Sequence, residues 1–494
     1  MPPKLAEDAP QASDPLILRF PQGLPGRDGN TYPWYGVGQS LVMVPADIVV
    51  TRALAWRLLR SSPQAHFLAV VYLTFPIVNA IAVVIAFSLL RSLHFAPSQA
   101  AAGALALLFG TTFLWNSQNN QENNLQLLLT LAAMAAVLRW NRTERQRELV
   151  LAGGLVGFNL LIRLTAMADV LGVALFALLL SPRQRRLGCM WDLVKYFAPV
   201  IAVGLLLDRG YHYWRFGTVW STYITMFGVE ARKLNATLSP AFPFGGVWWR
   251  GVLGPLVSPG KSIFIYDPLI VITIAIFWAC RRQLTQEVKA FMASLSVILM
   301  LIIAAYATYY NWEGSSCWGN RFTTTPVHAA ALLAVPLSVR LSRKWFAIAV
   351  TVLILSIAIQ VSSLAFPSFY EEVENGGEGR IKPLPGCRPP GEYFVLGERI
   401  KNLAVFATHS QSRPLTCEGQ PMGSPLVMLV PLMPFATLSP GKGMLIKGAW
   451  TLAFVTLLGV LLLLRYVAGN GWQQDDCETT APPNQVTGIR SRDG

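Results

Sequence analysis

Long apolar runs separated by short basic loops constrain the fold of this chain more than any other feature of its sequence. A helix of about 17–25 apolar residues is long enough to cross the hydrocarbon core of a bilayer. Charged residues make up 13% of the 494 residues, whereas soluble domains contain about 25%. The runs lie at residues 66–90, 98–116, 120–139, 149–163, 167–181, 193–210, 263–280, 287–308, 324–340, 345–366 and 446–466. The sequence therefore predicts an all-α polytopic membrane protein with about eleven transmembrane helices.

The basic residues between these runs predict the orientation of the chain. They gather in alternate loops, namely at Arg91 and at residues 139–147, 183–186, 281–282 and 340–344. Loops rich in Lys and Arg face the cytoplasm, so the intervening segments are expected outside. The net charge of +14 follows from this topology and does not indicate nucleic-acid binding. This orientation places the amino end outside, with no preceding helix to export it. We therefore expect a further helix upstream; the alternative is that the amino end crosses the membrane unaided.

The same pattern divides the chain into four parts. Residues 1–62 form an external segment with a first catalytic-type loop and, at 37–59, an amphipathic stretch expected to lie in the membrane interface. Residues 63–366 form the transmembrane core, 367–445 an external loop region, and 446–494 the last helix with a cytoplasmic tail. Cys387 and Cys417 share the external loop region, where a disulfide and two free thiols are both open interpretations.

Asp28 lies in an irregular, aromatic-rich stretch just ahead of the helices, GRDGNTYPWYGVGQSLVMVP. One interpretation is a turn, because Asp-Gly-Asn favours hydrogen bonds between side chain and backbone. The other is a general base above a cavity at the bilayer surface. In that case the loop, with the aromatic residues Tyr32, Trp34 and Tyr35, would close over an acceptor and partly desolvate the carboxylate, which would raise its pKa.

Two further polar groups interrupt the apolar pattern near the expected outer face. The stretch NSQNNQENN surrounds Glu122 with amides, and it fits either a solvated turn or a site. Arg163 separates two short apolar runs that resemble a broken helix pair. Helices break inside membranes where they line a cavity, and buried ionisable residues there are commonly functional. We therefore expect Arg163 to face a site.

Two outer loops combine cations with aromatic residues. In VSPGKSIFIYDP, Lys261 next to Tyr266 is either an interfacial anchor or a site residue. In YYNWEGSSCWGNRF, an aromatic belt would explain Trp312 and Trp318 but not the Gly-Asn-Arg that ends in Arg321. The long external segment at 211–262 is also basic, against the usual charge bias, which favours an anionic ligand such as a phosphate. The sequence contains no nucleotide-binding glycine fingerprint, Walker loop, HExxH or GxSxG motif.

Four stretches together resemble the GT-C membrane glycosyltransferases, the class that includes protein O-mannosyltransferases and lipid A aminoarabinose transferases. They extend over residues 28–326 and read DGNTYPWYGVGQSLVMVP, FGTTFLWNSQNNQENNLQLLL, RFGTVW followed by SPGKSIFIYDP, and NWEGSSCWGNRF. The resemblance implies a GT-C-like helical bundle with outward-facing loops and a sugar donor on polyprenyl phosphate. It also implies that Asp28 acts as base on the acceptor hydroxyl, with Glu122 as the second candidate catalytic acid. Family members often carry another acid beside the first-loop one, whereas Asp28 is flanked by Arg27 and Gly29.

This chemistry assigns further roles. Inverting transfer needs one carboxylate to take the acceptor proton, while a phosphate leaving group needs positive charge. The candidates for that charge are Arg321, Arg163 and Lys261, and Arg321 is preferred because guanidinium binds phosphate with two hydrogen bonds. The residues expected to line the substrate cavity are Tyr32, Tyr35, Tyr266, Trp312 and Trp318.

The remaining expectations concern cofactors, partners and location. No cofactor is predicted; a divalent metal near Glu122 is compatible with the chemistry, but too few ligand-type residues surround it. The expected partners are the lipid bilayer, a polyprenyl-phosphate-linked sugar and an acceptor of unknown class. The expected location is a bacterial inner membrane with the site facing outward. The competing hypotheses are a transporter of an anionic solute and an inactive, lipid-binding scaffold.

Overall fold

The computed structural model is almost entirely helical and describes residues 23–32, 36–55, 63–117, 122–234, 236–314, 317–364 and 394–408. A short hairpin at the start pairs β1 (Leu24–Pro25) with antiparallel β2 (Thr31–Tyr32). The helices that follow are α2 (Val37–Ala55), α3 (Pro63–Ser92), α4 (Pro97–Gly110), α5 (Phe113–Asn116), α6 (Asn123–Thr143), α7 (Gln146–Ile162), α8 (Met167–Leu180), α9 (Arg186–Asp192), α10 (Ala198–Phe216), α11 (Tyr223–Leu234), α12 (Trp248–Val257), α13 (Ile263–Tyr266), α14 (Leu269–Cys280), α15 (Gln286–Tyr306), α16 (Thr324–Ala331), α17 (Ala334–Leu341), α18 (Arg343–Ser363) and α20 (Val395–Thr408).

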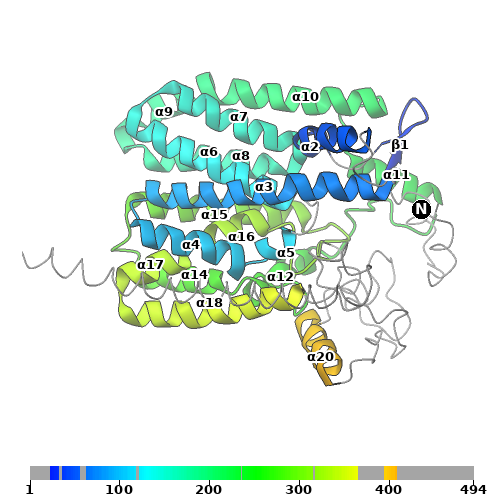
Figure 1. Cartoon of the computed structure of the whole chain (residues 1–494). Coiled ribbons are helices and arrows are strands. Elements are labelled where there is room, and N and C mark those ends of the chain that lie inside the picture. The colour runs from blue at the N-terminus through cyan, green and yellow to red at the C-terminus, as the bar shows by residue number, and fades with distance from the viewer. Residues whose placement is uncertain are drawn as a thin grey trace, which may run out of the picture.

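Most of these helices run side by side, from α10 at one edge of the bundle to α18 at the other (Figure 1). Within the described residues, five helical stretches are long and apolar enough to cross a membrane. They are Ala69–Ser92, Arg183–Phe216, Gln286–Tyr306, Thr324–Leu341 and Arg343–Ser363, and shorter apolar helices cover Leu164–Leu180 and Leu269–Cys280. The predicted class, an all-α polytopic membrane protein, is therefore confirmed. The spans predicted before residue 367 are helical where the structure describes them, but three of them are each divided between two helices, namely 98–116 (α4 and α5), 263–280 (α13 and α14) and 324–340 (α16 and α17). The span predicted at 446–466 lies outside the described residues.

The loops gather at the two ends of the bundle as the positions of the basic residues predicted. Arg142 at the end of α6 bonds to the Ser92 carbonyl and, at 2.9 Å, to Glu287 at the start of α15. Arg185 pairs with Glu144 at this same end. The hairpin, α5, α11 and α20 lie toward the opposite end (Figure 1). Which end faces the cytoplasm stays a prediction.

Small residues let α7 and α10 approach closely. Gly153 and Gly157 face α10 and the turn before it, where an added Cβ would lie 2.7 Å from the Phe197 carbonyl oxygen and 3.2 Å from that of Val200. A Cβ on Gly204 of α10 would lie 2.5 Å from the Gly157 carbonyl oxygen. Helices in membranes commonly associate through such small-residue faces, because lipid tails provide no hydrophobic drive for association. This contact places α10, with its aromatic carboxyl end, beside α7.

Candidate functional site

The break between α7 and α8 brings two of the predicted site residues together. Arg163 has an extended backbone (φ −154°, ψ 127°) between the end of α7 and a 3-10 turn at Leu164–Ala166. One of its guanidinium nitrogens lies 3.2 Å from a carboxylate oxygen of Glu122, the residue that precedes α6. Their side chains are only 6% and 5% exposed. The broken helix predicted from the sequence is therefore present, and a buried ion pair occupies the break.

Arg321 joins this pair through Phe322. The guanidinium carbon of Arg163 lies 5.1 Å from the centre of the Phe322 ring, and that of Arg321 lies 5.2 Å from it. Both distances are within the reach of cation–π attraction, about 6 Å. Tyr306, at the end of α15, stacks on the same ring with 3.9 Å between centroids. Three predicted residues, Glu122, Arg163 and Arg321, thus converge from three separate segments.

A third cation, Lys261, is buried against the loop that carries Arg321. The Lys261 ammonium donates to the Cys317 carbonyl at 2.7 Å, and Lys261 is 1% exposed. Tyr266 meets Trp318 edge to face at 5.2 Å. Lys261 is therefore a buried group rather than a simple anchor at the membrane surface. Residues 317–322, hereafter the cation loop, contact both Lys261 and the Arg163 side chain.

Trp312 has a packing role in this structure. An added Cβ on Gly254 of α12 would lie 2.1 Å from the Trp312 ring, so the indole fills the space that this glycine leaves. The Trp312 carbonyl accepts a hydrogen bond from the Asn320 side chain at 3.1 Å. These contacts fix the segment ahead of the cation loop. Whether Trp312 also lines a substrate cavity stays a prediction.

Asp28 occupies the turn of the β1–β2 hairpin, where its side chain is exposed. Its carboxylate accepts bonds from the Tyr32 hydroxyl at 2.6 Å and from the Asn30 side chain and backbone at 2.8 and 3.1 Å. These bonds, that from Tyr32 first, lower the pKa of Asp28 below its usual value. Without an acceptor, Asp28 is thus exposed and its hydrogen bonds favour the charged form. That the loop closes over an acceptor and raises this pKa stays a prediction.

The Asp28 hairpin is fixed to the carboxyl end of α10. The Tyr32 ring meets Trp214 and Phe216 edge to face at 5.5 and 6.1 Å. The Arg27 amide donates to the Arg215 carbonyl at 2.9 Å. Tyr35 lies outside the described residues. The turn interpretation thus describes the geometry of Asp28, and its role as a base stays a prediction.

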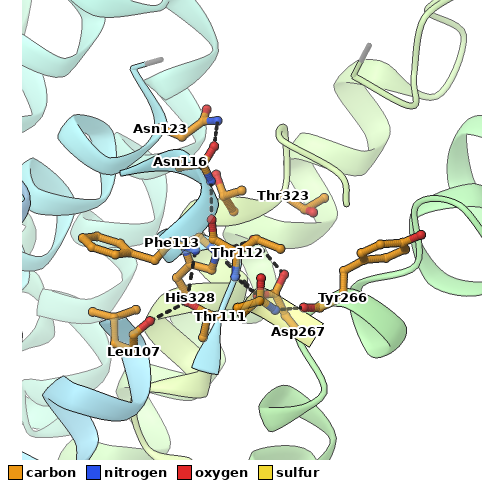
Figure 2. Close-up of polar contacts among 12 residues, drawn as sticks. Leu107, Thr111, Thr112, Phe113, Asn116, Asn123, Tyr266, Asp267, Thr323 and His328 are labelled. Atoms are coloured by element: carbon orange, nitrogen blue, oxygen red, sulfur yellow. Dashed lines mark hydrogen bonds and ion pairs between the residues drawn. The ribbon is translucent and has the colours of Figure 1, made fainter. Parts of the chain in front are cut away.

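Sequence reasoning missed a buried polar cluster centred on Thr112, in the break between α4 and α5. The Thr112 amide and hydroxyl donate to the two carboxylate oxygens of Asp267 at 2.6 and 3.0 Å. The His328 Nε2 lies 2.7 Å from the same hydroxyl, so Thr112 sits between the acid and the imidazole (Figure 2). Because the Thr112 hydroxyl donates its hydrogen bond to Asp267, it accepts from His328, whose Nε2 is then the donor. The cluster joins α5, α14 and α16.

Part of the amide-rich stretch is also buried. Asn123 donates to the Asn116 side chain at 3.1 Å, and Asn124 donates to the Asn79 side chain of α3 at 2.9 Å. These residues are at most 6% exposed. Where the structure describes it, this stretch is therefore a buried hydrogen-bond network rather than a solvated turn. Among the described residues, no group of three or more His, Cys, Asp or Glu side chains is placed to hold a metal ion.

Residues 65–207 match the model of the dolichyl-phosphate-mannose-protein mannosyltransferase family. The resemblance to the GT-C class is confirmed over this segment. It contains Glu122 and Arg163, together with the helix break that brings them together. The cation loop and Lys261 lie beyond it.

Two solved structures are similar to the chain at low identity. ArnT from Cupriavidus metallidurans, crystallised with undecaprenyl phosphate, has 14% identity and a TM-score of 0.39, covering 77% of this chain and 62% of that one. The apo oligosaccharyltransferase of Archaeoglobus fulgidus has 12% identity and a TM-score of 0.37, covering 72% and 50%. The chain thus spans less than two thirds of either structure. The search of curated proteins gives no match.

Proposed function

We propose that the chain is a membrane glycosyltransferase that moves a sugar from a polyprenyl-phosphate donor to an acceptor on the extracytoplasmic side, with inversion. The observation that carries the proposal is the buried Glu122–Arg163 pair. The pair lies in the segment that matches the mannosyltransferase family, and its arginine contacts the Phe322 ring, which Arg321 also contacts. The membrane is proposed to be a bacterial inner membrane, with this end of the bundle outward.

The buried Arg163 and Lys261 and the partly buried Arg321 are suited to a phosphate leaving group. As the bond from sugar to phosphate breaks, negative charge grows on the phosphate, and fixed positive groups stabilise it most where water is excluded. Glu122 offsets the charge of Arg163 and fixes its direction, and Arg321 places a second guanidinium against the same Phe322 ring. Guanidinium groups can bind phosphate through two parallel hydrogen bonds. Lys261 would contribute a third cation, held by its hydrogen bond to the Cys317 carbonyl of the cation loop.

Asp28 is proposed as the base that accepts the acceptor proton. A base must be ionised before reaction, and the lowered pKa of Asp28 keeps its carboxylate charged at neutral pH. Its exposure makes it accessible to an acceptor arriving from the aqueous side. Glu122 is the alternative acid, but its carboxylate is buried against Arg163. On this proposal Glu122 orients Arg163, and Asp28 takes the proton.

The experiment is turnover of the full chain, purified into lipid nanodiscs, with a radiolabelled polyprenyl-phosphate sugar and candidate acceptors. Arg163→Met should abolish release of polyprenyl phosphate. Arg139→Met is the matched control, because Arg139 pairs with Glu148 at the opposite, basic end of the bundle. Uptake of the free anionic solute by vesicles, without release of polyprenyl phosphate, would instead support a transporter. Binding without turnover would support a scaffold.

A further inference from the structure

Helix α20 is fastened to the end of the bundle by a buried arginine. Arg399 is completely buried, and one guanidinium nitrogen donates to the Ser362 and Ser363 carbonyls at 3.1 Å each. These carbonyls belong to the last turn of α18, whose final carbonyl groups have no partner within the helix. A cation there is also favoured by the helix dipole. Arg399 therefore caps α18 from a helix that follows it in the chain.

The same guanidinium reaches the cation loop. Its carbon lies 5.0 Å from the centre of the Trp318 ring. Trp318 directly follows Cys317, whose carbonyl accepts a hydrogen bond from the Lys261 ammonium at 2.7 Å. The indole that Arg399 contacts and the carbonyl that holds Lys261 therefore belong to adjacent residues.

A second contact from α20 ends on the same turn. The Leu396 amide donates to the Tyr266 hydroxyl at 3.2 Å, and that hydroxyl lies 3.3 Å from the Pro259 carbonyl that accepts from it. Pro259 and Tyr266 flank Lys261 in the chain. Two contacts therefore connect α20 to the turn at 257–266, one through Trp318 and one through Tyr266, and these two rings also meet each other.

We propose that Arg399 is a positioning residue that sets the Lys261 ammonium in place for the donor phosphate, by holding α20 and Trp318 against the turn at 257–266. The part that concerns phosphate rests on the function proposed above. The part that concerns the turn does not, because it depends only on contacts within the chain. The two parts are therefore tested separately.

The first test is hydrogen exchange of the full chain in nanodiscs without ligand. The Ser262 and Tyr266 amides are hydrogen-bonded within the turn at 2.9 and 3.1 Å, so their protection reports on its order. In Arg399→Met, residues 257–266 should exchange about 10-fold faster, and Arg399→Lys should lie between it and the wild type. Lys401→Met is the matched control, because Lys401 is on the same helix with a side chain 66% exposed. Unchanged exchange of 257–266 in Arg399→Met would overturn the proposal.

The second test is binding of a short polyprenyl phosphate, with the matching polyprenol as a second arm. We expect Arg399→Met and Lys261→Met each to weaken phosphate binding about 10-fold, and the double variant to be no weaker than Lys261→Met, since residues that act through one another are not additive. Polyprenol binding should not change. If the two single-variant losses in phosphate binding multiply in the double variant, or if polyprenol binding weakens as much as phosphate binding, positioning through Lys261 is refuted. Should the wild type bind neither lipid, the proposed function fails while the exchange result stands on its own.

Discussion

The Glu122–Arg163 pair gives the sharpest test of the candidate site. At 3.2 Å, two unit charges attract by about 5 kcal/mol at an effective dielectric constant of about 20. Most of this attraction offsets the cost of removing both groups from water, so the pair as a whole adds little stability. Removing one partner, however, leaves the other buried without the opposite charge of this pair. We therefore expect Glu122→Gln to lower the free energy of unfolding by about 3–5 kcal/mol.

The double variant separates this mechanism from ordinary packing loss. Glu122→Gln with Arg163→Met removes both charges, so it should cost little more than Arg163→Met alone, and the coupling between the two sites should reach about 2–3 kcal/mol. The Arg139–Glu148 pair is the matched control, with a shorter separation of 2.9 Å but an arginine side chain 49% exposed. Exposed pairs contribute about 0.2–1 kcal/mol.

The measurement is SDS titration in mixed micelles, followed by tryptophan fluorescence, on the wild type and on the two single variants and the double variant of each pair. A coupling for Glu122 and Arg163 no larger than that for Arg139 and Glu148 would refute the reasoning. It would mean that water reaches the break between α7 and α8. The same variants would then also lose their value as tests of a phosphate site that depends on exclusion of water.

Three further predictions concern the site and the topology. Asp28→Asn should lower turnover about 10²–10⁴-fold with donor affinity unchanged, and Tyr32→Phe should shift the acidic limb of the pH–rate profile upward. The shift is upward because the hydrogen bond from Tyr32 lowers the pKa of Asp28, so without it the carboxylate protonates at higher pH. Full turnover in Asp28→Asn would make Glu122 the candidate base instead. Arg321→Ala should weaken donor binding by about 2–5 kcal/mol, far more than Trp318→Phe, and equal losses would reduce Arg321 to a structural role. A single cysteine introduced at 139–148 should be labelled only from the cytoplasmic side, and labelling from outside would reverse the topology.

The helices were predictable because a bilayer leaves few alternatives. Backbone groups in hydrocarbon must be bonded within the segment, so an apolar run of sufficient length has to be helical. The break at Arg163 was predictable for the same reason, since a charge at membrane depth must face a cavity or a partner. That its partner is Glu122 was not predictable, because the sequence does not determine which loop ends meet.

The contacts that the sequence did not reveal connect distant segments. Thr112 bonds to Asp267 and His328, which follow it by 155 and 216 positions. Each is a single polar residue beside an apolar run, and such residues become partners only when three helix ends pack together. Asp28 is the opposite case, because its bonds to Asn30 and Tyr32 are local. The Asp-Gly-Asn pattern indicated that turn, but not its attachment to α10.

The cation loop contacts two groups of cations, Arg163 with Arg321 at Phe322 and Lys261 with Arg399 next to Trp318, so its backbone should control both. Gly319 has a φ of +74°, which side chains other than glycine rarely adopt. An added Cβ would also lie 3.1 Å from the Cβ of Tyr266 and 3.4 Å from the Thr112 methyl group. Gly319→Ala should therefore cost about 1–3 kcal/mol in strain.

Relief of that strain would move the loop at both of its contacts. In Gly319→Ala we expect the coupling between Glu122 and Arg163 to fall and residues 257–266 to lose protection from hydrogen exchange together. Gly29→Ala is the matched control, because Gly29 also has a positive φ, +81°, with no atom within 4 Å of an added Cβ. It strains the Asp28 turn and leaves the cation loop untouched. If Gly319→Ala alters one group of cations and not the other, the two are held independently, and the loop is a connection between helices rather than the frame of one site.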